Sequence, residues 1–263
     1  MFRIIKNLFP FNRAEISENK TLTVQKSSEK WITNPGQEGF EVRYRIKKLL
    51  YHGASRFQTI DVIEHENFGR MLFLNNDAQI AESDGQLYND ALVDPLVGKK
   101  DMRNIAILGG GDGGVLATAL ALKPKSVTMV EIDEEVMRVA KEFFPNFHKN
   151  AFSHKNARIV VDDVYNFLDK LQIYDAIIYD LTMHPEEFMN INREVFLDSL
   201  FAKIRRNLRK EGMLTLQCSS EFDADTLRVT HTVLHKYFTK VNFTKVFIPS
   251  FCAHWIFASA EAK

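Results

Sequence analysis

The sequence is poor in the features that define several large classes of protein. It has only two cysteines in 263 residues, Cys218 and Cys252, and they lie far apart in apolar, strand-like segments. This pattern favours buried free thiols over a disulfide framework or a metal centre. No apolar run approaches the roughly 20 residues that a membrane-spanning helix needs.

An excess of charge is also missing, because 34 Lys and Arg balance 34 Asp and Glu. No net field therefore favours nucleic acid or an anionic membrane as a partner. The first ten residues are basic and apolar, but charged residues follow them instead of the apolar core and cleavage site of a secretory signal. We expect a globular cytoplasmic protein with small-molecule substrates, and with neither nucleic acid nor a membrane as partner.

One segment is rich in glycine, and it carries most of the information. Ile105-Ala-Ile-Leu-Gly-Gly-Gly-Asp-Gly-Gly114 is followed closely by Val127-Thr-Met-Val-Glu-Ile-Asp133. The two runs read as an apolar strand, a glycine turn, a helix and a second strand that ends in acids. Glycine lets the backbone approach a ligand, and an acid after the second strand suits the two hydroxyls of a ribose.

Asp112 lies inside the glycine turn, which is unusual for this pattern. A dinucleotide site places pyrophosphate there, and a carboxylate would repel it. A cationic ligand would instead be attracted. The sequence thus predicts a nucleoside that bears positive charge, and a sulfonium such as S-adenosylmethionine or its decarboxylated form is the leading candidate.

From residue 103 onward, predicted strands and helices alternate. This rhythm is typical of an α/β fold with a Rossmann-like, methyltransferase-type sheet that has helices on both faces. The predicted strands are Asn104–Leu108, Ser126–Glu131, Arg158–Val161, Tyr174–Asp180 and Met213–Cys218, followed by an antiparallel pair at Val241–Phe247 and Cys252–Ala258. The predicted helices are Gly114–Leu122, Glu134–Phe144, Val164–Leu171, Arg193–Asn207 and Asp225–Tyr237.

The preceding part is richer in short β segments. Strands are predicted at Arg43–Leu50, Gln58–Glu64 and Met71–Asn75, separated by His52-Gly53 and by Asn67-Phe-Gly69, and a helix at Gln86–Val97. We therefore expect three units. They are an N-terminal arm (1–39), a small antiparallel β domain (40–98) and a Rossmann-like nucleoside-binding catalytic domain (99–263).

Acids fall at four predicted strand ends, namely Asp112, Glu131, Asp163 and Asp180. In open α/β sheets the ligand lies beyond the carboxyl ends of the strands. One such acid is often only a helix cap, but four in register predict a site. Glu131 suits the ribose and Asp163 the adenine amino group, so that Asp112 and Asp180 face the reacting centre. Two carboxylates there favour a polycationic substrate.

Other polar residues fit a structural role better. Asp162 reads as a solvated cap and Asp84 as the end of a hairpin. His184, just past Asp180, is either a base or a surface residue. The remaining histidines show no spacing that predicts a metal site.

At these motifs the chain resembles the spermidine/spermine synthase family, the polyamine aminopropyltransferases. The two signature runs are Leu108-Gly-Gly-Gly-Asp-Gly-Gly114 and Met129-Val-Glu-Ile-Asp133. Agreement extends from residue 40 to 258 through Phe57-Gln58, Phe68-Gly-Arg70, Ala81-Glu-Ser-Asp84, Val161-Asp-Asp163, Tyr179-Asp-Leu-Thr182 and Ile248-Pro-Ser-Phe251.

This resemblance implies a homodimer that moves an aminopropyl group from decarboxylated S-adenosylmethionine, a co-substrate, to a primary amine. Methylthioadenosine is released, and neither a metal nor a tightly bound cofactor is needed. Asp112 and Asp180 match the family's catalytic acids. The implied donor-binding residues are Gln58, Asn89, Gly110, Asp112, Glu131 and Asp163, and the implied acceptor-binding residues are Tyr88, Asp180 and Phe251.

The acceptor side departs from the family pattern. Many spermidine synthases have a second acid where Met183 stands, and spermine synthases have Tyr and Glu at Phe251 and Ala253. Leu122-Lys-Pro-Lys-Ser-Val-Thr128 leans toward the spermine synthase branch. Spermidine and putrescine both stay open as acceptors. Two alternative functions also stay open, an amine methyltransferase that uses S-adenosylmethionine and a catalytically silent nucleoside-binding homologue.

Overall fold

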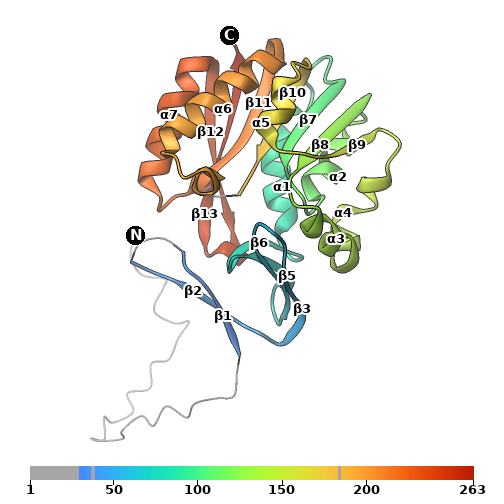
Figure 1. The fold of residues 1–263 in the computed structure, drawn as a ribbon, viewed down its shortest axis with the longest axis vertical. Coiled ribbons are helices and arrows are strands. Elements are labelled where there is room, and N and C mark those ends of the chain that lie inside the picture. Colours follow the sequence, from blue (N-terminus) through green and yellow to red (C-terminus); the bar gives the residue numbers. More distant parts are fainter. Residues whose placement is uncertain (1–29, 37–38, 183–184) are drawn as a thin grey trace, which may run out of the picture.

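The computed structural model describes residues 30–36, 39–182 and 185–263. Its centre is a seven-stranded sheet in the order β12-β13-β11-β10-β7-β8-β9 (Figure 1). Pairing is parallel from β9 to β11, and β13 and β12 add an antiparallel edge. The strands are β7 (Asn104–Gly109), β8 (Ser126–Glu131), β9 (Ala157–Val161), β10 (Tyr174–Asp180), β11 (Leu208–Ser220), β12 (Phe238–Ile248) and β13 (Ala253–Ala262).

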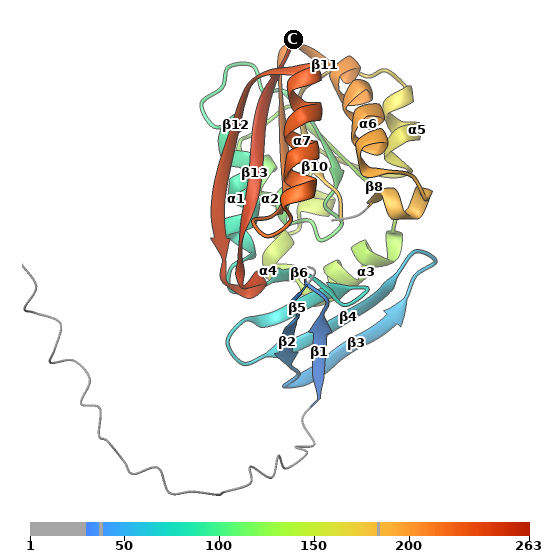
Figure 2. The ribbon, with the colours of Figure 1, turned by 90° about the vertical axis from the view of Figure 1, so that its left-hand side faces the viewer.

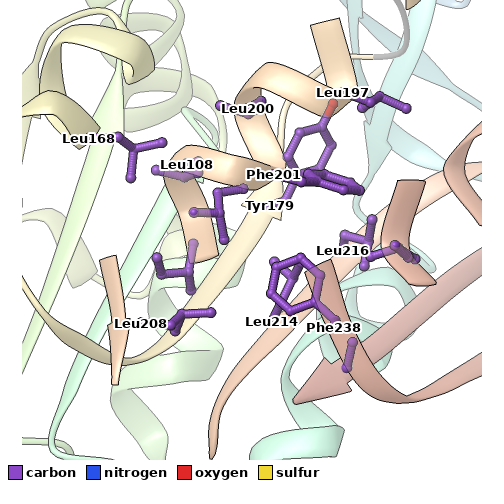
Figure 3. Close-up of a cluster of buried hydrophobic side chains, with 14 of the residues drawn as sticks. Leu108, Leu168, Tyr179, Leu197, Leu200, Phe201, Leu208, Leu214, Leu216 and Phe238 are labelled. Carbon is purple, nitrogen blue, oxygen red and sulfur yellow. The ribbon is translucent and has the colours of Figure 1, made fainter. Parts of the chain in front are cut away.

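Helices cover both faces of this sheet (Figures 1 and 2). One face packs against α1 (Gly85–Val93), α2 (Gly114–Ala121) and α3 (Glu134–Phe143), and the other against α5 (Val164–Asp169), α6 (Arg193–Asn207) and α7 (Ala224–Tyr237). Figure 3 shows the hydrophobic core between the sheet and α5, α6 and α7, where Leu108 and Tyr179 of the sheet meet Phe201 of α6. Short helical turns complete the chain at α4 (Pro145–His148), Asp94–Leu96, Ala151–Ser153, Pro185–Met189 and Pro249–Phe251.

These observations confirm the predicted fold class. The predicted bounds of β8, β10 and α6 match those of the structure. For the two strands, the reason is that largely apolar runs mark strands buried on both faces. Proline shortens the helix predicted at Gln86–Val97, which ends at Val93 and passes into a 3-10 turn with Pro95. Within the described residues, no helix is long and apolar enough to cross a membrane.

Two small antiparallel sheets lie below the large one in Figure 1. The four-stranded sheet has the order β3-β4-β5-β6, and a separate pair is formed by β1 and β2. Their strands are β1 (Trp31–Asn34), β2 (Val42–Arg45), β3 (Lys48–Ala54), β4 (Thr59–His65), β5 (Gly69–Leu74) and β6 (Asp77–Ala81).

Two local predictions in this part are wrong. Arg43–Leu50 is not one strand but parts of β2 and β3, which belong to different sheets; an apolar/polar alternation does not reveal such a bend. His52-Gly53 does not separate strands, since both residues pair with β4. A Cβ on Gly53 would lie 2.4 Å from the Tyr51 hydroxyl, so glycine here makes room for that ring. The end of the predicted arm, Trp31–Asn34, is strand β1.

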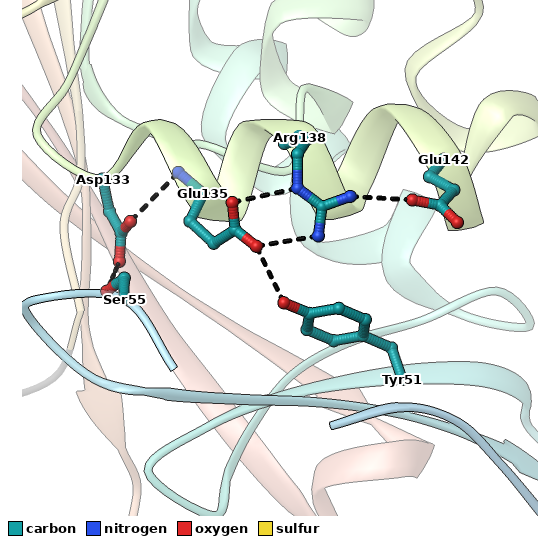
Figure 4. A network of polar contacts seen from close by, with 6 residues as sticks. All are labelled: Tyr51, Ser55, Asp133, Glu135, Arg138 and Glu142. Atoms are coloured by element: carbon teal, nitrogen blue, oxygen red, sulfur yellow. Dashed lines mark hydrogen bonds and ion pairs between the residues drawn. The ribbon is translucent and has the colours of Figure 1, made fainter. Parts of the chain in front are cut away.

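Helix α3 joins the four-stranded sheet to the large one (Figure 4). Asp133 caps α3 by accepting from the amide of Glu135, as its position before the helix predicts. The hydroxyls of Ser55 and Tyr51 donate to Asp133 (2.6 Å) and Glu135 (2.7 Å). These contacts fix the small sheet against the edge of the large sheet where the parallel strands end.

Candidate active site

A cavity of about 600 Å³ opens beyond the carboxyl ends of the parallel strands. It lies where β7 and β10 are neighbours, the point at which the order of the strands reverses, and this is the usual ligand position in open α/β sheets. Its walls come from the large sheet, from the four-stranded sheet and from the β1–β2 hairpin. Most of the site residues predicted from the sequence line it, namely Gln58, Tyr88, Gly110, Asp112, Glu131, Asp163, Asp180 and Phe251.

The glycine turn allows β7 and β10 to approach closely at the floor of the cavity. Gly109 and Gly110 have left-handed backbones, with φ of +86° and +76°. A Cβ on Gly109 would lie 2.2 Å from the carbonyl oxygen of Asp180, and the amide of Gly110 donates to that oxygen at 3.1 Å. Glycine is therefore required here, because a side chain would push the turn away from Asp180.

Two acids and a tyrosine form the reacting end of the cavity. The Tyr88 hydroxyl donates to Oδ1 of Asp180 at 2.8 Å, and the amide of Gly114 donates to Oδ1 of Asp112 at 2.7 Å. Burial raises the pKa of Asp180, and the negative charge of Asp112 raises it further. Burial also raises the pKa of Asp112, against the effect of the Gly114 amide. These carboxyls lack a cationic partner at hydrogen-bond distance among the described residues, and a bound cation would stabilise their charged forms.

Glu131 lies at the end of β8, beside the glycine turn. Its Oε1 accepts from the amide of Asp133 at 2.9 Å, and its Oε2 would lie 2.8 Å from a Cβ on Gly111. Burial raises the pKa of Glu131 to about 7. A partly buried carboxylate that can accept two further hydrogen bonds suits a vicinal diol.

The two acids after β9 have different surroundings. Asp163 lines the cavity and also caps α5, since its Oδ1 accepts from the amide of Tyr165 at 2.7 Å. Asp162 lies outside the lining, and its Oδ2 pairs with Lys170 at 2.7 Å. This contact lowers the pKa of Asp162, which agrees with its interpretation as a solvated cap.

Gln58 lines the cavity and is held by a hydrogen bond to Asp133. Its Nε2 donates to Oδ2 of Asp133 at 2.9 Å, the same oxygen that accepts from Ser55. The carboxylate of Asp133 therefore has two roles, to cap α3 and to orient Gln58. The local sequence does not reveal the second role, because Gln58 and Asp133 are 75 residues apart.

Gln217 and Trp255 are lining residues that the sequence argument missed. The indole of Trp255 donates to Oε1 of Gln217 at 3.0 Å, and Nε2 of Gln217 donates to the carbonyl oxygen of Leu181 at 2.7 Å. These two hydrogen bonds hold the backbone that follows Asp180 against β13. An amide within the apolar run of β11 was the available signal, because a buried polar side chain needs a partner.

The β1–β2 hairpin closes one side of the cavity. Phe40 and Val42 line it, and the ring of Phe40 packs edge-on against Phe222 with centroids 5.3 Å apart. Composition alone did not predict this, since residues 1 to 39 are mostly polar. The end of the predicted arm also contributes, since Asn34, Pro35 and Gly36 line the cavity.

One predicted donor-binding residue, Asn89, is absent from the cavity lining. Asn89 is 1% exposed and lies behind the glycine turn, where its Nδ2 would be 2.6 Å from a Cβ on Gly114. Met183 and His184 lie outside the described residues. No group of three or more potential metal ligands occurs among the residues that the structure describes.

Together, a Rossmann-like sheet, a glutamate at the end of β8 and a pair of partly buried acids beside the glycine turn are typical of a nucleoside-dependent transferase that acts on a cation. Comparison with models of known protein families identifies the family within this class. Residues 86–263 match the spermine/spermidine synthase domain and residues 30–82 the spermidine synthase tetramerisation domain. The chain belongs to the spermine/spermidine synthase family.

Curated relatives agree with this assignment. A polyamine aminopropyltransferase from Sulfolobus acidocaldarius is 30% identical over 222 residues, covering 83% of this chain and 73% of the relative. Polyamine aminopropyltransferase 1 from Hyperthermus butylicus is 32% identical over 232 residues, covering 84% and 78%.

Solved structures support the same fold. Spermidine synthase from Thermotoga maritima has a TM-score of 0.78 and 19% identity, covering 88% of this chain and 79% of its own. A spermidine synthase in complex with the transition-state analogue AdoDATO has a TM-score of 0.80 and 19% identity, covering 93% and 82%.

Proposed function

We infer that the protein is a polyamine aminopropyltransferase. It moves the aminopropyl group of decarboxylated S-adenosylmethionine to a primary amine and releases methylthioadenosine. The relatives above carry this activity in their names. In the structure, the observation that supports it most is the pair Asp112 and Asp180 with Tyr88, which line one cavity and can hold a cationic amine beside a cationic donor.

The reaction needs little from the protein beyond positioning and one proton transfer. The amine nitrogen attacks the methylene next to the sulfonium, so that a C–N bond forms while the C–S bond breaks and its electron pair stays on sulfur. The amine must first lose a proton, and we assign its acceptance to Asp180 as general base. Holding the two reactants in line supplies a further part of the rate.

We propose that the donor lies along the strand ends. Glu131 accepts from the ribose hydroxyls, Asp163 from the adenine amino group, and Asp112 from the aminopropyl ammonium. Gly110 gives the sulfonium end room, Gln58 contacts that end, and Asn89 supports the glycine turn from behind. The full donor carries an extra carboxylate, which would lie near Asp112, and the two like charges would repel.

The acceptor is the least constrained part of this proposal. Phe251, Ala253 and Trp255 line the side of the cavity that we assign to the acceptor, and none of them supplies a carboxylate for a second ammonium. We propose spermidine or putrescine, held by Asp180 and Tyr88 beside Phe251. A methyltransferase and a silent homologue are not favoured, because the matched relatives are aminopropyltransferases.

Self-association belongs to the proposal as well. The model that matches residues 30–82 is described as a tetramerisation domain, and Leu49 on β3 of the four-stranded sheet is 47% exposed. We propose a homodimer as the smallest assembly, and light scattering after gel filtration would measure it. The cytoplasmic location and the division at residues 39 and 98 stay predictions.

An acceptor screen tests the proposed activity. Purified protein is incubated with decarboxylated S-adenosylmethionine and, separately, putrescine, cadaverine, spermidine or thermospermine, and methylthioadenosine is quantified. Amine-dependent methylthioadenosine is expected, and the best amine identifies the acceptor. Tight nucleoside binding without product on any amine would favour the silent homologue.

A further inference from the structure

Asp84 occupies the N-cap position of α1, where an aspartate commonly accepts from the first helical amides. Its side chain makes no such bond. Instead its Oδ2 accepts from the amide of Ser250 at 2.6 Å and its Oδ1 from the Ser250 hydroxyl at 2.8 Å. Asp84 is 6% exposed and Ser250 0%. The carboxylate thus joins two segments 166 residues apart.

A third segment meets the same serine. The Tyr44 hydroxyl, on β2, donates to the carbonyl oxygen of Ser250 at 2.6 Å. Tyr44 is 2% exposed, and burial raises its pKa, so the hydroxyl keeps its proton and stays a donor. The amide, the hydroxyl and the carbonyl of Ser250 are therefore all held by buried partners.

Each of the three segments carries a residue that lines the cavity. Phe251 follows Ser250, Tyr88 lies one turn along α1 from Asp84, and Val42 lies two residues before Tyr44. The rings of Tyr88 and Phe251 have centroids 6.3 Å apart. The contacts of Ser250 thus tie together three segments that line the cavity, one of which carries Tyr88, the hydrogen-bond donor to Asp180.

We propose that Asp84 and Ser250 are positioning residues for the acceptor amine, because they fix Tyr88 and Phe251 relative to each other. This rests on the proposed function, since the amine is the acceptor of aminopropyl transfer. The donor side is held by other contacts, those of Asp133 with Gln58 and Glu131. Disrupting the contacts among Asp84, Ser250 and Tyr44 therefore weakens amine binding and leaves nucleoside binding unchanged.

Two variants test the proposal. Asp84→Asn keeps the shape but replaces one accepting oxygen with a donor, and Ser250→Ala removes the hydroxyl. Affinity for putrescine and spermidine is read from Trp255 fluorescence with methylthioadenosine bound, in a Trp31→Phe background, because the chain has two tryptophans. The amine Kd is expected to rise about tenfold or more. The methylthioadenosine Kd, measured by calorimetry, stays within about twofold.

Asn207→Ala is the matched control. Asn207 is 1% exposed and its Nδ2 donates to the carbonyls of Leu168 and Lys203, at the amino ends of the strands, away from the cavity. The Asn207→Ala variant loses these buried hydrogen bonds, and we expect the Kd of the amine and the Kd of methylthioadenosine to stay unchanged. Unchanged amine affinity in folded Asp84→Asn would overturn the proposal, and so would an equal weakening of both Kd values.

Folding and chemistry are scored separately. If Asp84→Asn does not fold, Ser250→Ala and Tyr44→Phe, each of which removes a single bond, decide in the same way. Wild-type protein that forms no product, with amine affinity still lost selectively in the variants, would overturn the proposed function and support the positioning role. Normal product with unchanged amine affinity would overturn the positioning role alone, and a wild type that binds no amine would overturn both.

Discussion

Tyr88 donates a 2.8 Å hydrogen bond to Asp180, across 92 residues of sequence. The bond joins the helix before the glycine turn to the acid at the point where the strand order reverses. A hydrogen bond to a carboxylate favours its charged form. Tyr88 therefore lowers the pKa of Asp180 while burial and the charge of Asp112 raise it.

Tyr88→Phe removes that bond and leaves the ring in place. The pKa of Asp180 rises further, and so the base is protonated over more of the working pH range. The acidic limb of kcat/KM for the amine should move to higher pH by about one unit, as expected for loss of a hydrogen bond to a charged group. A pH profile of the initial rate measures this, and a limb at the wild-type position would contradict the role of Tyr88.

Asp180→Asn removes the proposed base. Turnover should fall by at least about 10²-fold, the lower end of general-base effects. Affinity for methylthioadenosine should change much less, since the proposed nucleoside contacts lie elsewhere. Asp162→Asn is the control, because Asp162 directly follows β9 of the same sheet but pairs with Lys170 outside the cavity. Equal turnover in the two variants would remove Asp180 from the mechanism.

Glu131→Gln should separate stability from donor binding. The folded pKa of Glu131 is about 7, above its ordinary 4.5. Both states are protonated below pH 4.5, and as the pH rises the unfolded chain ionises first, so the charge progressively costs stability up to about pH 7. The variant should be more stable than wild type at pH 8, by at most about 3 kcal/mol, and similar at pH 4.5.

Donor affinity in Glu131→Gln should fall about tenfold or more, as expected for weakened hydrogen bonds to a charged acceptor. Glutamine can still accept from the Asp133 amide, so the local fold is kept. Urea unfolding at the two pH values and donor calorimetry are the measurements. A variant less stable than wild type at pH 8, or one with unchanged donor affinity, would contradict this role.

Ala253→Glu restores a carboxylate to the acceptor wall. A far ammonium would gain a charge partner there, and so the preference for spermidine over putrescine, as a ratio of kcat/KM, should rise about tenfold. Ala253→Gln is the control of equal size without charge. A ratio that moves equally in both variants would show that size, and not charge, sets acceptor choice.

The sequence was sufficient for the parts of the site that depend on local pattern. The apolar runs, the glycine turn and the strand-end acids predicted the sheet and placed Asp112, Glu131 and Asp180 at one edge. Each signal lies within a few residues, and the topology of parallel strands then brings the ends together.

The remainder depends on partners that are distant in the chain. No local signal indicates that Asp84 turns away from its helix to bind Ser250, or that Asp133 orients Gln58. The prediction of one strand at residues 43–50 missed the break between β2 and β3, because β2 pairs with β1 and β3 with β4, and the local sequence shows neither pairing.

The most direct test compares the two donors on one preparation. The protein is incubated with the best amine and either decarboxylated or full S-adenosylmethionine, and both products of each reaction are identified by mass spectrometry. The account predicts methylthioadenosine and an aminopropylated amine from the decarboxylated donor alone. Adenosylhomocysteine and a methylated amine from the full donor would contradict it.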